Sequence, residues 1–153
     1  MNSRNIEKSE YDGTSEGETM STARSMMAAH PDGEPLLAEA LGACIEAAFS
    51  CAQASDACAD ACMAEETVTE LRKCIRLNLD CAELCVTTGR FLSRLTDVDG
   101  NLLKTILMAC RDFCTTSAME NEKHAATYPS CRIAAEECRR CEQACQDLLP
   151  RPF

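Results

Sequence analysis

Residues 44–62 read CIEAAFSCAQASDACADAC, and this stretch decides the fold. Its cysteines are Cys44, Cys51, Cys58 and Cys62, so the gaps are seven, seven and four residues. In a helix that turns about 100° per residue, a step of seven slips back about 20° and a step of four advances about 40°. All four thiols then lie within an arc of about 40°. The pattern therefore predicts a helix with one cysteine-lined face.

The same spacing recurs in three later stretches of the chain. Each of the four stretches carries two cysteines four residues apart, and side chains at that spacing are neighbours on a helix surface. These pairs are Cys58/Cys62, Cys81/Cys85, Cys110/Cys114 and Cys141/Cys145. The thirteen cysteines thus form four stripes, which are Cys44, Cys51, Cys58 and Cys62; Cys74, Cys81 and Cys85; Cys110 and Cys114; and Cys131, Cys138, Cys141 and Cys145.

Start and stop signals divide this region into four helices. Pro35 suits a first helical turn, residues 67–70 have the spacing of a capping box, residues 97–101 form a turn, and Pro129 suits a new start. Four long helices with short connections predict an all-α, antiparallel, up-down-up-down four-helix bundle. The helices are expected at 35–64, at 67–95, from the 97–101 turn to 124, and at 129–149.

The N-terminal region has no such pattern. Residues 1–20 are polar and Gly/Ser/Glu-rich, which is typical of a disordered acidic tail, and residues 21–30 predict a short helix before the bundle at 35–149. Met20, Met26 and Met27 are soft side chains in this region without an assigned role. We find no apolar signal region and no run of about 20 apolar residues, so we expect a cytoplasmic protein.

Composition limits the function classes. The formal net charge of −10 argues against nucleic acid and against an anionic membrane as partners. Aromatic residues make up only 4% of the chain, so something other than large side chains fills part of the interior. Thirteen is an odd number of cysteines, and cytoplasmic thiols stay reduced, so a disulfide scaffold is disfavoured.

The cysteine stripes favour a metal site over a plain core. Cysteine packs as a small hydrophobe, but leucine or isoleucine would stabilise a core more. Thiolates select copper(I), zinc or iron–sulfur clusters. Structural zinc usually uses C-x-x-C turns, here only Cys138/Cys141, and ferredoxin-type spacings are absent. Copper(I) accepts fewer sulfurs per ion, so the stripes favour several copper(I) ions; a zinc–thiolate or a structural or redox bundle is the alternative.

An enzyme is not indicated. Di-iron helical bundles need Glu-x-x-His motifs, but Asn121 stands three residues before His124 and Met27 three before His30. A single thiol nucleophile would leave twelve cysteines without a role. We therefore expect no catalytic residues.

The two ends of the bundle should differ. Extending the stripes places Leu37, Leu41, Leu92, Leu103, Leu107 and Leu149 together beside the 97–101 turn, and we call this the leucine end. The other end, the thiol end, gathers Cys62, Cys74, Cys131, Met63 and His124. Met63 and His124 are candidate additional ligands, and copper(I) is expected to load through the His124/Cys62/Cys131 end.

Several segments resemble the bacterial copper storage proteins of the cytosolic branch. They include residues 43–46, 58–65, 74–76, 80–85 and 138–145, in matching order and spacing. The resemblance covers about residues 36–149. It implies a cysteine-rich four-helix bundle that stores and buffers multiple copper(I) ions per monomer in the cytoplasm, and a homotetramer.

The chain departs from the family pattern at several positions. Ala48, Ser55, Ser117 and Ala134 stand where the pattern would place further cysteines. Tyr128 and Ser130 stand where it would place further histidines near one bundle end.

Overall fold

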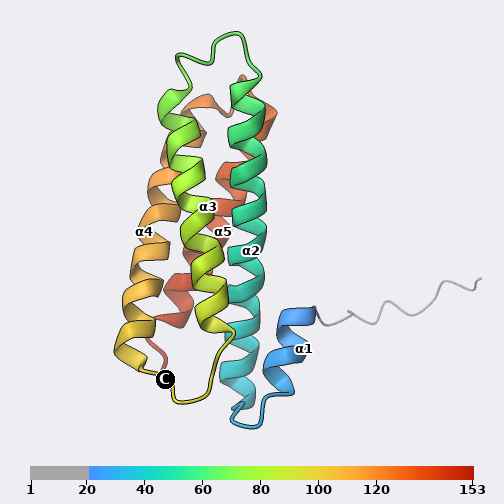
Figure 1. Cartoon of the computed structure of the whole chain (residues 1–153), viewed down its shortest axis with the longest axis vertical. Coiled ribbons are helices and arrows are strands. Elements are labelled where there is room, and N and C mark those ends of the chain that lie inside the picture. The colour runs from blue at the N-terminus through green and yellow to red at the C-terminus, as the bar shows by residue number, and fades with distance from the viewer. Residues whose placement is uncertain (1–20) are drawn as a thin grey trace, which may run out of the picture.

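The computed structural model describes residues 21–153, which form five helices and no strand. Predictions about residues 1–20, including Met20, lie outside the described residues. The helices are α1 (Thr22–Ala28), α2 (Pro35–Met63), α3 (Arg72–Leu92), α4 (Gly100–His124) and α5 (Pro129–Leu148). Helices α2 to α5 form a bundle in which consecutive helices run in opposite directions (Figure 1). The predicted all-α fold class is confirmed.

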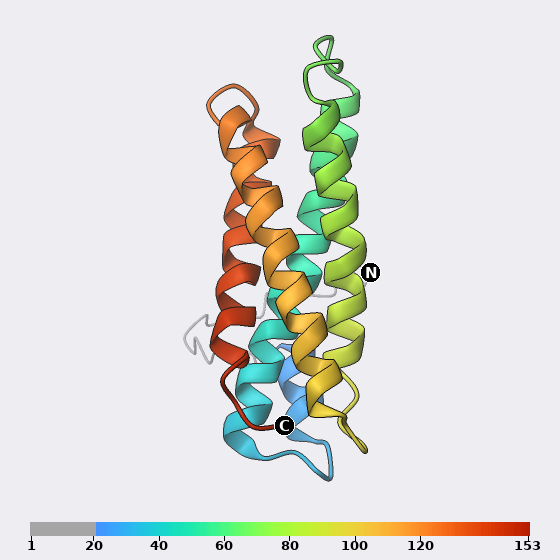
Figure 2. The same ribbon diagram turned by 90° about the vertical axis from the view of Figure 1, so that its left-hand side faces the viewer.

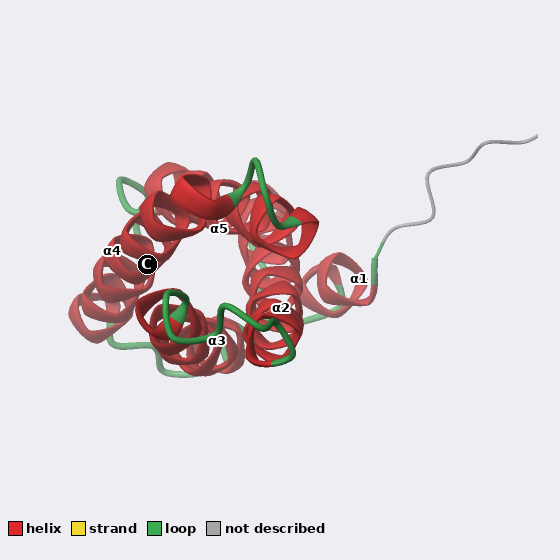
Figure 3. Ribbon diagram, turned by 90° about the horizontal axis from the view of Figure 1, so that it is seen from above, coloured by secondary structure: helices red, strands yellow, loops and turns green. Residues whose placement is uncertain are grey.

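The four long helices stand at the corners of a square. Helix α2 packs against α3 and α5, and α4 packs against the same two helices (Figure 3). Figure 2 shows the bundle from the side as two helix pairs, α2 with α3 and α4 with α5. Residues 64–71 join α2 to α3 at one end. The inward faces of all four helices therefore share one interior.

Three helix starts follow from local sequence. Pro35 occupies the first turn of α2, where its missing N–H costs nothing, and the Glu34 carboxylate accepts a hydrogen bond from the Leu37 N–H at 2.8 Å. Asp99 caps α4 by accepting from the backbone N–H groups of Asn101 and Leu102. Pro129 opens α5 in the same way as Pro35 opens α2.

The predicted start of the second bundle helix at residues 67–70 is wrong. Helix α3 begins at Arg72, and the preceding residues form turns. The Thr67 hydroxyl lies 2.6 Å from the Tyr128 hydroxyl instead of capping the helix. Leu71 is fully buried beneath the turns. Burying a leucine outweighs a capping box, which contributes about 1 kcal/mol.

The short helix α1 is fastened to α2 by charge and close approach. Arg24 pairs with Glu39 at 2.7 Å and with Glu46 at 3.4 Å. A Cβ added at Gly42 would lie 2.6 Å from the Arg24 side chain, so only glycine allows this contact. Helix α1 therefore packs on the outside of the bundle rather than entering it.

Helix α2 meets the length and hydropathy of a membrane span, with a mean hydropathy of 1.4 in its most apolar window. The expectation that no segment would do so is therefore wrong. Half of that window is buried inside the bundle. Alanine and cysteine give α2 its high hydropathy. Most of these residues line the shared interior, and a core helix of a bundle has the same apolar inner face.

The leucine end is built largely as expected. Leu41, Leu92 and Leu107 are buried, with at most 1% of their surface exposed. Leu148 takes the buried position expected for Leu149, which is only partly buried. A pocket of about 150 Å³ remains there, lined by residues that include Leu37, Leu95, Val98, Leu103 and Phe153.

Candidate metal centre

All thirteen cysteines are unpaired thiols and all are buried. None exposes more than 1% of its surface. They lie on the inner faces of α2 to α5, as the register of the stripes predicts. The interior of the bundle is therefore lined with sulfur over much of its length.

Nine of these thiols form one connected set, which we call the nine-thiol group. Cys51 lies at its centre, with its sulfur 3.6 Å from that of Cys138, 3.9 Å from that of Cys81 and 4.0 Å from that of Cys114. The sulfur of Cys85 lies 3.5 Å from that of Cys114. The full group is Cys44, Cys51, Cys81, Cys85, Cys110, Cys114, Cys138, Cys141 and Cys145.

The sulfurs of the nine-thiol group cluster in sets that share members. One set takes one cysteine from each bundle helix: Cys51, Cys85, Cys114 and Cys141. Two further sets share Cys51 or Cys141 with it: Cys51, Cys81 and Cys138; and Cys110, Cys141 and Cys145. Within each set all sulfurs lie within 4.8 Å of one another. A cysteine that belongs to two sets can bridge two metal ions through one thiolate, so this arrangement suits bridging thiolates.

The other four thiols form the four-thiol group at the thiol end. They are Cys58 and Cys62 of α2, Cys74 of α3 and Cys131 of α5. Sulfur–sulfur distances are 3.7 Å for Cys62–Cys131, 3.8 Å for Cys58–Cys131 and 3.9 Å for Cys74–Cys131. Leu71 and Tyr128 pack against this group, so its thiols are covered rather than open to solvent.

A buried polar layer lies between the two groups. Asn78 and Asn121 hydrogen-bond each other in both directions, at 3.0 and 2.9 Å. Asn78 also donates to the Cys74 sulfur at 3.4 Å, and Ser117 donates to Asn78 at 3.4 Å. On the other side, the Ser55 hydroxyl lies 3.8 Å from the Cys138 sulfur. Sequence reasoning noted Asn121 and Ser117 but missed Asn78, although it follows Cys74 by four residues on the same stripe.

The predicted pairs within one helix are only part of the arrangement. Cys58 and Cys62 share a set, and so do Cys141 and Cys145. Cys110 and Cys114 belong to different sets, as do Cys138 and Cys141, the only C-x-x-C pair. Sulfur contacts across helices therefore organise the centre more than contacts within a helix.

The two candidate ligands other than cysteine lie outside the thiol sets. The His124 Nε2 atom lies 3.6 Å from a carboxylate oxygen of Glu120, and its ring centroid lies 6.4 Å from that of Tyr128. Met63 is 52% exposed at the end of α2. In the described part of the chain, no set of potential ligands includes His124. His124 therefore borders the thiol end without joining a thiol set, and Met63 follows Cys62 at the exposed end of α2.

The packed sulfurs shift one another's protonation. In the four-thiol group, hydrogen bonding from neighbouring thiols, chiefly Cys74, lowers the pKa of Cys58 to about 6. Burial and the charge of Cys58 raise the pKa of Cys62 to about 12. In the nine-thiol group, hydrogen bonding from Cys114 lowers the pKa of Cys81 to about 6. Each group thus favours some thiolate at neutral pH, and the thiolate is the form that binds metal.

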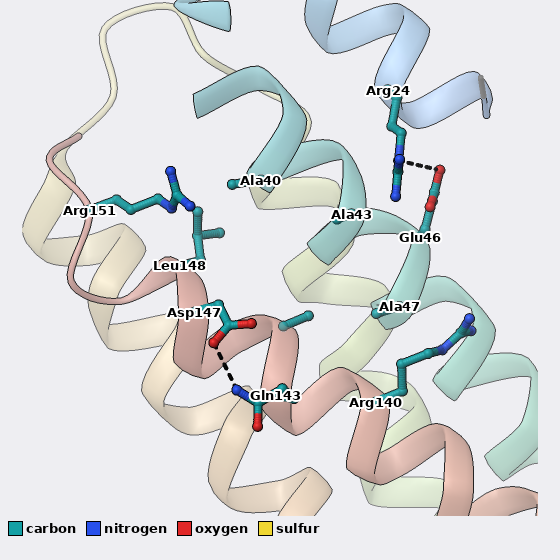
Figure 4. Close-up of a pocket in the computed structure, with 11 residues that line it drawn as sticks. Arg24, Ala40, Ala43, Glu46, Ala47, Arg140, Gln143, Asp147, Leu148 and Arg151 are labelled. Atoms are coloured by element: carbon teal, nitrogen blue, oxygen red, sulfur yellow. Dashed lines mark hydrogen bonds and ion pairs between the residues drawn. The ribbon is translucent and has the colours of Figure 1, made fainter. Parts of the chain in front are cut away.

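The outer surface offers a different kind of pocket. Figure 4 shows a pocket of about 520 Å³ lined by residues of α1, α2 and α5 and by Arg151. Arg140 and Arg151 line it together with Asp147, and no cysteine is among its lining residues. This pocket therefore lacks the thiols that line the interior.

A four-helix bundle with a sulfur-lined interior defines a class of protein that binds several soft metal ions. The family model described as copper storage protein matches residues 37–150. The chain belongs to the copper storage protein family.

Two solved structures and one sequence relative are similar to this chain. The copper storage protein Ccsp from Streptomyces lividans, loaded with 10 copper equivalents, is 45% identical with a TM-score of 0.82, covering 84% of this chain and 98% of that one. A structure of the cytosolic copper storage protein from the same organism with five coppers is 46% identical with a TM-score of 0.77, covering 78% and 100%. The uncharacterized cysteine-rich protein YhjQ of Bacillus subtilis is 30% identical over 106 residues, 69% of this chain and 93% of its own length.

Proposed function

We propose that this chain stores and buffers copper(I) in the cytoplasm by binding multiple ions as thiolates inside the bundle. The observation that carries the proposal is the burial of thirteen free thiols in two contiguous groups. Soft thiolates select copper(I), and shared sulfurs suit several ions close together. The similar Streptomyces lividans protein has been solved with five and with 10 copper equivalents, and it is described as cytosolic.

Anaerobic titration of the reduced chain tests this function. Copper(I) is added in the presence of a competing chelator, and bound ions are counted per monomer. We expect a number near the thiol count and little change in helicity, because leucine and alanine packing holds the bundle without metal. A zinc-finger-like domain would instead be unfolded without its metal. Binding of only one or two copper(I) ions, or an unfolded metal-free chain by circular dichroism, would contradict the proposal.

We propose the thirteen cysteines as the ligands, and the thiol end as the loading route. Copper(I) moves between thiolates by ligand exchange, so loading requires soft donors from the surface inward. Met63 is exposed there, His124 lies at the edge, and the four-thiol group lies directly beneath Leu71. Replacing Met63 and His124 together by alanine is expected to change the rate of copper uptake more than the final capacity. A changed capacity with an unchanged rate would place them as storage ligands instead.

We propose no catalytic activity for this chain. Its thiols are buried, and metal saturation would leave no free nucleophile. The family is one of storage proteins. Turnover of a small substrate that disappears on changing one cysteine, with copper capacity intact, would overturn this.

We propose that the bundles assemble as a homotetramer, and we expect neither nucleic acid nor membrane as a partner, given the net charge of −10. Large apolar side chains on the outer faces support association: Leu79 is 40% exposed on α3 and Phe113 is 42% exposed on α4. Light scattering of the metal-free and the copper-loaded chain tests this, and a monomer mass in both states would contradict it.

A further inference from the structure

The four-thiol group stands apart from the rest of the sulfur-lined interior. Its sulfurs contact one another, and none belongs to a set of the nine-thiol group. The layer of Asn78 and Asn121, with Ser55 and Ser117, fills the space between the groups. Because an amide and a hydroxyl are poor bridges between soft metal ions, this layer separates the two groups chemically.

The spacing of the four sulfurs matches one tetrahedral ion. Zinc–sulfur bonds of about 2.3 Å in a tetrahedron place the sulfurs about 3.8 Å apart. Four of the six distances in the group lie between 3.7 and 4.0 Å. The two remaining distances, from Cys74 to Cys58 and to Cys62, lie within 4.8 Å. Only a small movement of the Cys74 side chain separates the group from a closed tetrathiolate.

The surroundings favour the negative charge of such a site. Cys74 lies in the first turn of α3 and Cys131 in the first turn of α5, where helix N-termini favour negative charge, whereas Cys62 lies in the last turn of α2, where the helix C-terminus opposes it. The two N–H groups of the Asn78 amide are shared among four acceptors: the Cys58 sulfur at 3.6 Å, the Cys74 sulfur at 3.4 Å, the Cys74 carbonyl at 3.0 Å and the Asn121 oxygen at 3.0 Å. When the thiols lose their protons, the Asn121 oxygen keeps its bond from Asn78. No buried acceptor is then left unpaired.

The interior set of Cys51, Cys85, Cys114 and Cys141 provides the contrast. Its four cysteines lie in the middle of their helices, away from any helix N-terminus. Cys51 and Cys141 also belong to other sets, so this set is open to bridging rather than closed around one ion. Four coordination by unshared thiolates is typical of zinc, whereas shared sulfurs suit copper(I).

We propose that the four-thiol group is a zinc site: Cys58, Cys62, Cys74 and Cys131 hold one zinc ion as a tetrathiolate, and copper(I) displaces it on loading. One Zn²⁺ and four thiols give a complex of charge −2 and four protons, which pass to solvent. On loading, copper(I) takes over the thiolates and Zn²⁺ is released unchanged, so no redox partner is needed. The zinc site stands on geometry alone, and only its displacement rests on the proposed storage function.

Cobalt(II) and zinc(II) titrations of the reduced, metal-free full-length chain test this proposal under anaerobic conditions. Cobalt(II) is a spectroscopic probe of the same tetrahedral site. We expect one cobalt per chain, with the sulfur-to-cobalt charge transfer and the intense visible bands of a tetrathiolate. One equivalent of zinc should remove these bands. Absence of the tetrathiolate spectrum, or uptake of several zinc ions per chain with equal affinity, would overturn the proposal without needing a variant.

Matched double variants locate the site. Cys62→Ser with Cys131→Ser should abolish tight zinc binding, while Cys85→Ser with Cys114→Ser should leave the single zinc in place. Circular dichroism of both metal-free variants checks that the bundle is intact. The reverse pattern would place the zinc in the nine-thiol group and sink the proposal.

Copper(I) titration of the zinc-loaded chain, read with a zinc-sensitive dye, completes the test. We expect one zinc released per chain. A chain that binds many copper(I) ions but no zinc refutes the zinc site and leaves storage standing. A chain that binds one zinc but few copper(I) ions refutes storage and leaves the zinc site standing.

Discussion

The leucine end and the thiol end are built on the same helical stripes and differ in what occupies them. At the leucine end, Leu41, Leu92 and Leu107 fill the interior. At the thiol end, Cys58, Cys62, Cys74 and Cys131 occupy the equivalent positions beneath a single leucine, Leu71. A stripe position therefore needs only a side chain that accepts burial. Which side chain it is decides whether that part of the bundle contributes stability or metal chemistry.

The energies of the two ends should differ accordingly. Full burial of a leucine stabilises a fold by about 1.5–3 kcal/mol, and its removal leaves a cavity that adds to the loss. Cysteine is smaller and buries less apolar area. The metal-free bundle is thus held mainly by its leucine end, by alanine packing between helices and by α1. The thiol-lined region depends on that support.

The largest expected effect is a loss of copper(I) capacity, and its size should differ between the nine-thiol group and the four-thiol group. The first variant changes one cysteine on each bundle helix to serine: Cys51, Cys85, Cys114 and Cys141. The five remaining thiols of the group then contact one another only in small, separate clusters. They are Cys44, Cys81, Cys110, Cys138 and Cys145. We expect copper(I) capacity to fall by at least about half, because bridging sulfurs are lost.

The matched control removes the same number of thiols from the other group. Changing Cys58, Cys62, Cys74 and Cys131 to serine should lower capacity by about a third, in proportion to the thiols removed. Copper content after anaerobic gel filtration measures both. Equal losses in the two variants would mean that the groups are not organised differently.

The free energy of unfolding should change most when a buried leucine at the leucine end is shortened to alanine. Leu41→Ala is expected to lower the free energy of unfolding by about 2–5 kcal/mol, because Leu41 is fully buried. Leu36→Ala, five residues away and 74% exposed, should change it by less than about 0.5 kcal/mol. Chemical denaturation of the metal-free chain gives both values. Copper capacity should stay the same in each variant, and a loss of capacity in Leu41→Ala would show that the two ends are not independent.

A pair of buried leucines distinguishes the loading end. Leu71 and Leu41 are both fully buried, at opposite ends of the bundle. Leu71→Ala removes the cover over the four-thiol group, so copper(I) uptake and its removal by a chelator should become severalfold faster. Leu41→Ala should lower stability with little change in either rate. Stopped-flow measurement of both variants decides between the ends, and faster uptake only in Leu41→Ala would reverse the assignment.

The smallest expected effect concerns Glu120, a largely buried carboxylate near the thiol end. Lys123 at 2.7 Å and Lys73 at 3.4 Å lower the pKa of Glu120 in the folded chain. A depressed pKa adds stability above the unfolded-state pKa of about 4.3, and this stability is lost as pH falls through the folded-state pKa. Glu120→Gln should therefore cost about 1 kcal/mol or less at pH 7 and nothing at low pH. An equal cost at both pH values would rule out the ion pairs as the cause.

Much of this architecture could be predicted from the sequence, because seven- and four-residue spacings fix which residues share a helix face. That register placed the thirteen cysteines and most of the leucines on the inner faces. It could not show that Cys51, Cys85, Cys114 and Cys141 meet, because the relative height of neighbouring helices depends on packing. Asn78 was missed because an asparagine among cysteines is neither a soft ligand nor an apolar core residue, although its spacing places it on the stripe. The start of α3 was misplaced because burial of Leu71 is a tertiary effect.

Anomalous X-ray scattering at the copper absorption edge, from crystals of the copper(I)-loaded chain, tests the central claim most directly. We predict copper ions bonded to cysteine sulfurs in both the nine-thiol and the four-thiol groups, and none among the side chains of the leucine end. Copper found mainly on the outer surface, at Met26, His30 or the acidic side chains, with the interior thiols unligated, would contradict this account of the protein.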